Sequence, residues 1–195
     1  AYSIEAAKQS IYVNRVVVST EDKEIAEIAN LLETEVVDRP RNLAGDKVLM
    51  DPVLLHAVNV LEMKDGYLPE HVLALPPTSP LRDVRCLDAA IEKYLTGEYD
   101  SLVSVCVNKN NRHEFDQNRI LLCPTFKESK NRSDRPESVF ENGAIYLSRL
   151  ELIREGRIRG DRMGFYEMDN FSSIDIDDPF DFDFAELLMQ IKQDN

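Results

Sequence analysis

The chain has 195 residues, of which 43% are hydrophobic, so it can bury a full core, and we expect residues 1–195 to form a single domain. Its formal net charge of −13 argues against nucleic acid or an anionic membrane as a partner, whereas a nucleotide stays compatible because a bridging metal ion and a few arginines can hold a triphosphate. The apolar stretches are too short for a transmembrane helix, the start is not typical of a signal peptide, and three scattered cysteines suit a reducing compartment, so we expect a cytoplasmic protein.

Along the chain, apolar residues alternate between helical and strand-like spacing. In chain order, the predicted elements are a helix over 2–10, a strand over 16–18, a helix with apolar positions from 25 to 32, a strand over 35–37, a helix with apolar positions from 54 to 61, a strand over 71–75, a helix from Asp83 to Tyr94, strands over 101–107, 144–147, 165–168 and 174–176, and a closing helix with apolar positions from 180 to 191. This alternation indicates βαβ units, so the sequence predicts an α/β fold with a mainly parallel sheet.

Two stretches interrupt the alternation. Residues 76–80 contain three prolines, which cannot donate hydrogen bonds to a sheet ladder, so a loop is predicted there. Residues 108–139 are mostly polar and charged. That excursion is compatible with a surface insertion, a dimerisation arm or a substrate-closing lid, and we favour the dimerisation arm.

The acidic run near the C-terminus is the strongest candidate site. If 174–176 is a strand, Asp175 and Asp177 point to one face, roughly 7 Å apart, while the neighbouring isoleucines point to the other. Mg²⁺ takes one or two carboxylates and leaves its other positions to water and phosphate, so Asp175 and Asp177 are candidate ligands for Mg²⁺ or Mn²⁺. The alternative is an acidic strand end before a helix, with Asp178 and Pro179 as N-cap and first helical residue.

Four segments together resemble a known family. They are 15–26 (RVVVSTEDKEIA), 77–82 (PTSPLR), 141–146 (ENGAIY) and 173–177 (SIDID). In this order they resemble the acylneuraminate cytidylyltransferases, also called CMP-sialic acid synthetases. The resemblance implies a Rossmann-like nucleotide-diphospho-sugar transferase fold with helices on both faces of the sheet and a homodimer built through the arm. It also implies a reaction in which CTP and a nine-carbon 2-keto sugar acid give the CMP-sugar and pyrophosphate.

The resemblance also implies roles for particular residues. Asp175 and Asp177 would hold the metal ion and act in catalysis. The residues implied to lie near the nucleotide are Arg39, Asp46, Thr78, Ser79 and Arg82. The residues implied to contact the sugar acid are Arg132, which would reach it from the neighbouring subunit, Asn142 and Tyr146. Arginine suits this role because its guanidinium group recognises carboxylates with two hydrogen bonds.

Three departures from the family pattern keep alternatives open. The glycine-rich, basic first strand and loop are absent, Pro76 replaces a common glutamine, and residues 48–50 (VLM) replace small hydroxyl residues. One alternative is a different substrate, either a legionaminic, pseudaminic or Kdo-like sugar acid or another nucleotide. Another is a fragment or non-catalytic homologue that dimerises without gripping triphosphate. We expect the natural protein to carry roughly two dozen further residues upstream, as one strand-loop-helix unit requires.

Overall fold

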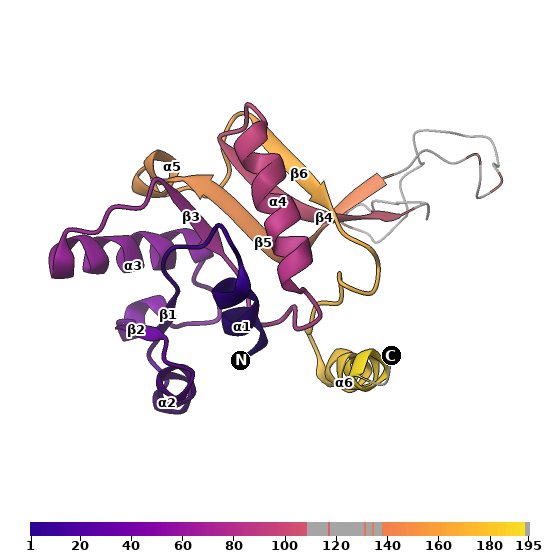
Figure 1. Cartoon of the computed structure of the whole chain (residues 1–195), viewed down its shortest axis with the longest axis horizontal. Coiled ribbons are helices and arrows are strands. Elements are labelled where there is room, and N and C mark those ends of the chain that lie inside the picture. The colour runs from indigo at the N-terminus through magenta and orange to yellow at the C-terminus, as the bar shows by residue number, and fades with distance from the viewer. Residues whose placement is uncertain (109–116, 118–130, 132–133, 135–137, 194–195) are drawn as a thin grey trace.

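The computed structural model describes residues 1–108, 117, 131, 134 and 138–193 (Figure 1). The helices are α1 (Tyr2–Gln9), α2 (Lys23–Leu31), η1 (Arg41–Leu43), α3 (Met50–Asp65), α4 (Val84–Thr96), α5 (Leu150–Arg154) and α6 (Pro179–Gln193). The strands are β1 (Val17–Thr20), β2 (Glu35–Asp38), β3 (His71–Ala74), β4 (Ser101–Asn108), β5 (Ser138–Arg149) and β6 (Met163–Glu167). The predicted alternation of strands and helices is therefore confirmed.

The strands of the described residues form two separate sheets. The larger has the order β3-β5-β4-β6, and the smaller pairs β1 with β2 in parallel. In the larger sheet β4 and β6 are parallel, whereas β5 runs antiparallel to both β3 and β4. The sheet is thus mixed, with β5 as its one reversed strand among the described residues, and the prediction of a mainly parallel sheet missed this reversal.

A cavity of about 820 Å³ is lined by residues of both sheets, from β1 of the smaller sheet and β3 of the larger one. Its lining includes all of β1 and most of β3, with further residues from α1, α2, α3 and α4. No ladder pairing joins β1 to β3 within the described part of the chain. The edges of β1 and β3 that are not paired with β2 and β5 therefore leave N–H and C=O groups without sheet partners.

Packing of α4 on the larger sheet makes the main core. Asp83 caps this helix by accepting a hydrogen bond from the backbone N–H of Cys86, as its position before the apolar run predicts. The buried residues of this cluster are Leu87, Ala90, Ile91, Tyr94, Leu102, Ala144, Ile145, Leu147 and Met168. The core therefore lies directly beneath β5, the strand that carries the ENGAIY motif.

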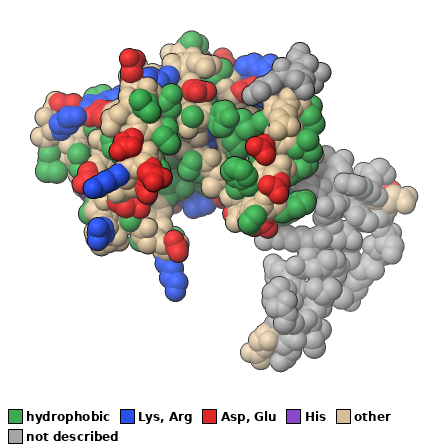
Figure 2. All heavy atoms as spheres, turned by 90° about the horizontal axis from the view of Figure 1, so that it is seen from below, with side chains coloured by type: hydrophobic (Ala, Val, Ile, Leu, Met, Phe, Trp, Pro, Cys, Tyr) green, Lys and Arg blue, Asp and Glu red, His purple; other side chains and the backbone are tan. Residues whose placement is uncertain are grey.

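Two predictions need correction. Residues 174–176 do not form a strand but a loop between β6 and α6, because the backbone from Asp169 to Ser173 folds into a turn on the Asp169 side chain. The stripe predicted for the closing helix comprises Phe180, Phe184, Leu187, Leu188 and Ile191. It lies on α6, but all of these side chains except Leu188 are exposed. Figure 2 shows hydrophobic and acidic side chains side by side on the underside of the molecule.

The remaining global expectations concern the arm and the membrane. The predicted arm over 108–139 lies mostly outside the described residues. Among the helices that the structure describes, none combines the length and the apolarity that a membrane crossing requires.

Candidate functional site

The site is built around a bulge in β5. Val103 and Val105 of β4 pair with Tyr146 and Glu141 of β5. One residue, Ser104, lies between the first two, whereas four residues, 142–145, lie between their partners. Bulges of this kind bend a strand and redirect its side chains, and they are common beside active sites. The Asn-Gly-Ala-Ile part of the predicted motif is therefore the irregular part of an otherwise regular strand.

Ser104 and Asn142 replace the ladder hydrogen bonds that the bulge removes. The Ser104 hydroxyl accepts from the backbone N–H of Ile145 at 2.8 Å and donates to Asn142 Oδ1 at 2.5 Å. Asn142 Nδ2 donates to Ser173 Oγ at 2.8 Å, in the acidic loop. Asn142 thereby links β4, β5 and the loop that carries Asp175.

Gly143 gives the Asp175 carboxylate its room. Gly143 has φ +72°, in the left-handed region that glycine adopts without steric cost. A Cβ atom at this position would lie 2.9 Å from Asp175 Oδ2. The Asp175 carboxylate therefore sits against the backbone of the bulge, where only a residue without a side chain fits.

The acidic loop is tied to the proline-rich loop. The backbone N–H of Ile176 donates to the carbonyl oxygen of Thr78 at 2.9 Å. Asp177 is exposed, and its backbone N–H donates to Asp181. Asp178 accepts from the N–H of Asp181 and donates its own N–H to that side chain, which forms a reciprocal N-terminal cap for α6. The N-cap role predicted for Asp178 is confirmed.

Two predicted nucleotide-binding residues, Ser79 in the proline-rich loop and Arg82 just after it, are buried. Ser79 is fully buried, and its hydroxyl has no hydrogen-bond partner among the described residues. Arg82 is 2% exposed, and its guanidinium group donates to the carbonyl oxygens of Ala144 and Pro76 and to the hydroxyl of Ser3. Burial lowers the pKa of Arg82 to about 10, so the side chain stays charged at neutral pH. A cation is thus held beneath the bulge.

Tyr146 follows the bulge on β5 and is half-buried. Burial raises the pKa of its phenol, and the carboxylates of Glu141 and Asp175 raise it further while Arg159 opposes them. Arg159 lies over the ring at 5.9 Å and forms an ion pair with Glu141. The Tyr146 phenol therefore stays neutral at neutral pH and lies close enough to Asp175 for the two groups to interact electrostatically.

The remaining candidates lie elsewhere. Arg39 follows β2, lines the 820 Å³ cavity and pairs with Glu21, whose pKa that hydrogen bond lowers. Asp46 is exposed in the turn after η1. No contact of Arg39 or Asp46 with the bulge is found within the described ranges. Arg132 falls outside the described residues. The structure thus brings together Thr78, Ser79, Arg82, Asn142, Tyr146 and Asp175, and does not add Arg39 and Asp46 to them. Asp177 lies two residues beyond Asp175 in the acidic loop, with its side chain exposed.

The donor set suits a divalent cation that also binds phosphate. Asp175 Oδ1 is buried and has no hydrogen-bond partner among the described residues, although a buried carboxylate oxygen ordinarily has one. No cluster of three or more acidic, histidine or cysteine side chains is found in the part of the chain that is described. Because 174–176 is a loop, the prediction that Asp175 and Asp177 share one face of a strand is wrong. The chemistry of the Asp175 carboxylate, with one oxygen open, still suits Mg²⁺, which takes one or two carboxylates and keeps water and phosphate oxygens among its ligands.

Sequence reasoning missed three members of the site. They are Ser104, Gly143 and Ser173, which make the contacts around Asn142 and Asp175. The Asn-Gly pair inside a strand pattern was the available signal, because an isolated glycine in a strand indicates a bulge. Neither serine lies in a pattern that predicts its role.

Solved nucleotidyltransferases share this Rossmann-like fold. A solved CMP:2-keto-3-deoxy-manno-octonic acid synthetase in complex with CTP superposes with a TM-score of 0.66 at 11% identity, covering 98% of this chain and 87% of that one. A 4-diphosphocytidyl-2C-methyl-D-erythritol synthase from Anaerococcus prevotii gives 0.68 at 11% identity, covering 97% of this chain and 84% of that one. At such identities the likeness is one of fold. The expected fold class is therefore confirmed.

The chain belongs to the cytidylyltransferase family, whose model matches residues 1–195. It is 31% identical to the N-acylneuraminate cytidylyltransferase of Escherichia coli O18:K1:H7 over 197 residues, which cover 98% of this chain and 46% of that protein. The chain thus spans about half the length of that relative. It is also 27% identical to the CMP-N,N'-diacetyllegionaminic acid synthase of Campylobacter jejuni over 200 residues, covering 98% of this chain and 84% of that protein.

Proposed function

We propose that this chain is a sugar-acid cytidylyltransferase, which joins CTP to a 2-keto sugar acid of the N-acylneuraminate type and releases pyrophosphate. The carrying observation is Asp175, a carboxylate held against the β5 bulge, with one buried oxygen that has no hydrogen-bond partner in the described part of the chain. Family membership over the whole chain and the names of the relatives support the reaction class. We further propose a cytoplasmic homodimer, with residues 108–139 as its arm.

In this proposal the anomeric hydroxyl of the sugar acid attacks the α-phosphorus of CTP. The new bond forms between the sugar oxygen and phosphorus, the bond to the pyrophosphate oxygen breaks, and Asp175 or Asp177 accepts the hydroxyl proton. Asp175 and Asp177 would hold Mg²⁺ or Mn²⁺, which would supply charge neutralisation at the phosphates. The chain's own part is mainly positioning, because phosphoryl chemistry of this kind requires little covalent participation by the protein.

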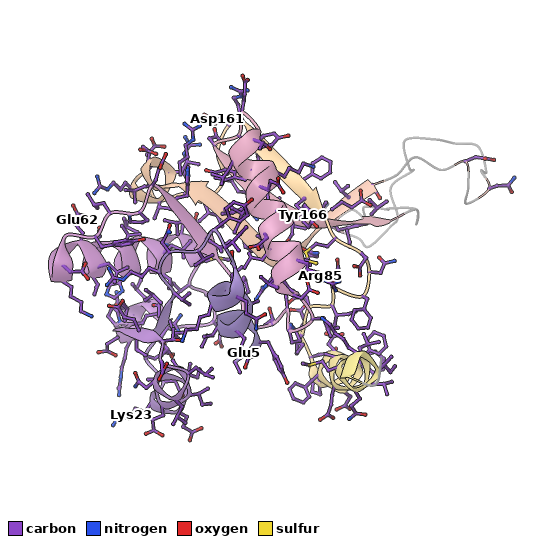
Figure 3. All side chains as sticks on the ribbon, viewed as in Figure 1. Glu5, Lys23, Glu62, Arg85, Asp161 and Tyr166 are labelled. Carbon is purple, nitrogen blue, oxygen red and sulfur yellow. The ribbon has the colours of Figure 1, made fainter. Side chains whose placement is uncertain are left out.

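The test is pyrophosphate release from CTP with Mg²⁺ and a panel of sugar acids. Asp175→Asn should reduce turnover at least a hundredfold while the fold stays intact by circular dichroism. Asp161→Asn is the matched control, because Asp161 is an exposed aspartate far from the acidic loop. In Figure 3, Asp161 lies near one end of α4 and Arg85 lies at the opposite end. Full activity of the Asp175→Asn protein would refute the assignment.

The identity of the sugar acid forms a second question. Pro76 and residues 48–50 depart from the family pattern, and relatives named for legionaminic and pseudaminic acids match nearly the whole chain. Comparing kcat/KM for N-acylneuraminic, legionaminic, pseudaminic and Kdo-type acids, each with CTP and then with the other nucleoside triphosphates, separates the candidates. The preferred substrate is the pair with the highest kcat/KM.

A different class of function is a homologue that dimerises without catalysis. The break between the two sheets favours this candidate, because β1 and β3 carry edges without partners where a nucleotide-binding sheet is usually continuous. Titration of the 195-residue chain with CTP by calorimetry, together with sedimentation, distinguishes the two functions. A dimer that binds no CTP would favour the non-catalytic candidate.

A further inference from the structure

The β5 bulge connects three backbone segments that the proposed reaction needs in fixed positions. Ser104 comes from β4, Asn142 and Gly143 from β5, and Ser173 and Asp175 from the acidic loop. Only Asp175 among them has an oxygen without a hydrogen-bond partner within the described residues. The hydroxyls of Ser104 and Ser173 and the amide of Asn142 already donate to and accept from protein groups, so they are suited to hold a neighbour.

We propose that Asn142 and Gly143 are positioning residues that set the place of the Asp175 carboxylate, and that Asn142 acts through Ser173 and not by touching the sugar acid. This inference rests on the proposed function, in which Asp175 binds the metal ion. It assigns the Asn-Gly pair of the ENGAIY motif to the metal side of the site.

The hydrogen bonds of Asn142 carry the first part of the inference. Its Oδ1 accepts from Ser104 Oγ at 2.5 Å and from the backbone N–H of Ala144 at 3.4 Å. Its Nδ2 donates to Ser173 Oγ at 2.8 Å and to Met168 Sδ at 3.4 Å. These four contacts fill the capacity of one amide, which has two donors and two acceptor positions. With 6% of its surface exposed, Asn142 has no free group for a sugar hydroxyl.

Ser173 transmits this constraint to Asp175. Its hydroxyl accepts from Asn142 and donates to the carbonyl oxygen of Asp169 at 2.7 Å, so both ends of the turn before Asp175 are fixed. On the other side of Asp175, the N–H of Ile176 is bound to the carbonyl oxygen of Thr78. Hydrogen bonds therefore fix the chain on both sides of Asp175, at Ser173 before it and at Ile176 after it.

Gly143 acts by what it lacks. A methyl group at this position would stand 2.9 Å from Asp175 Oδ2, which is closer than real Cβ atoms approach other atoms. The carboxylate would have to move, and its two anchored neighbours leave the side-chain torsions as the main freedom. Displacement of the carboxylate changes metal binding before it changes the fold.

The first test compares two glycine variants. Gly143→Ala and Gly156→Ala both place alanine in the left-handed region, with φ +72° and +77°, but a Cβ atom at Gly156 meets nothing within 4 Å. Backbone strain is thus matched, and contact with Asp175 differs. The probe is Mn²⁺ alone, titrated into the full chain and followed by electron paramagnetic resonance. The binding abolished by Asp175→Asn defines the site. We expect Gly143→Ala to weaken this binding at least tenfold and Gly156→Ala to leave it unchanged.

The second test removes one hydroxyl at a time. Ser173→Ala takes away the acceptor of Asn142 Nδ2, whereas Ser148→Ala takes away a buried serine hydrogen bond to the carbonyl oxygen of Ile158, farther along β5. We expect Mn²⁺ affinity and kcat to fall in Ser173→Ala with little change in KM for the sugar acid. Ser148→Ala should change neither.

The outcomes separate the inference from the proposed function. If the unaltered chain binds no Mn²⁺ that depends on Asp175, the metal site of the proposed function fails. If that binding exists and Gly143→Ala matches Gly156→Ala, the positioning role of Gly143 is refuted. If Ser173→Ala or Asn142→Ala raises KM for the sugar acid with unchanged Mn²⁺ affinity, Asn142 contacts the sugar and its positioning role is refuted.

Discussion

Replacing Arg82 by methionine should destabilise the fold by about 2–3 kcal/mol. The substitution keeps the length of the stem and removes the guanidinium group, which donates to Ala144 O at 2.6 Å, to Pro76 O at 3.3 Å and to Ser3 Oγ at 2.5 Å. Hydrogen bonds to charged groups contribute about 1.5–3 kcal/mol each. Against them stands the cost of burying the charge, about 3 kcal/mol for a pKa lowered from 12.5 to about 10.

The balance is a net loss, because Arg82→Met takes the guanidinium donor away from the carbonyl oxygen of Ala144 inside the bulge. For a chain of this size the melting temperature should fall by about 5–10 °C. Urea unfolding followed by far-ultraviolet circular dichroism measures the free energy of unfolding. Arg159→Met is the matched control, since its side chain is 50% exposed and its ion pair with Glu141 lies at the surface, where such pairs contribute about 0–1 kcal/mol. An Arg82→Met protein as stable as the Arg159→Met protein would refute the reasoning.

Three further predictions use other parts of the chain. Burial raises the pKa of Asp100, but the backbone N–H groups of residues 162 and 161 outweigh burial and hold that pKa below its usual value. The contribution of Asp100 to stability is therefore present above the ordinary aspartate pKa and is lost as the pH falls through the lower folded pKa. Asp100→Asn should flatten the fall of the urea midpoint below about pH 4. Asp178→Ala should cost about 1 kcal/mol in the same assay, because it removes the N-cap of α6, and an unchanged midpoint would contradict the cap. Ile28→Lys should reduce binding of the dye anilinonaphthalene sulfonate to the 820 Å³ cavity that Ile28 lines, whereas Leu31→Lys, on the same helix but outside that lining, should not; equal effects would argue against binding in the cavity.

The regular elements were predictable because each carries a local signal. Asp83 before an apolar helical run predicted the start of α4, and its side chain indeed caps the N–H of Cys86. Residues 101–107 predicted β4 by their β-branched and apolar content. These signals arise from short-range sterics and hydrogen bonds, which act within one turn or one strand.

The site was predictable in composition and not in geometry. Asp175 was predicted to point from a strand, but the turn formed on Asp169 replaces the strand with a loop. Which polar groups become partners across this loop depends on contacts between β4, β5 and residues 169–176, and a single sequence does not encode such pairings locally. The antiparallel direction of β5 was missed for the same reason, because it depends on pairing with β3 and β4 and no local pattern in the sequence indicates that pairing.

The division of the sheet has a consequence for how the molecule opens. Since β1 pairs only with β2 within the described residues, the unit formed by β1, α2 and β2 lacks the ladder that ties β3, β4, β5 and β6 together. Such a unit can unfold on its own below the global free energy of unfolding, as a foldon does. Arg39 lies just beyond β2 on this foldon, whereas Asp175 lies in the loop after β6, against the bulge of β5 in the larger sheet. The distance between these two groups is therefore only as fixed as the packing of the foldon against the larger sheet.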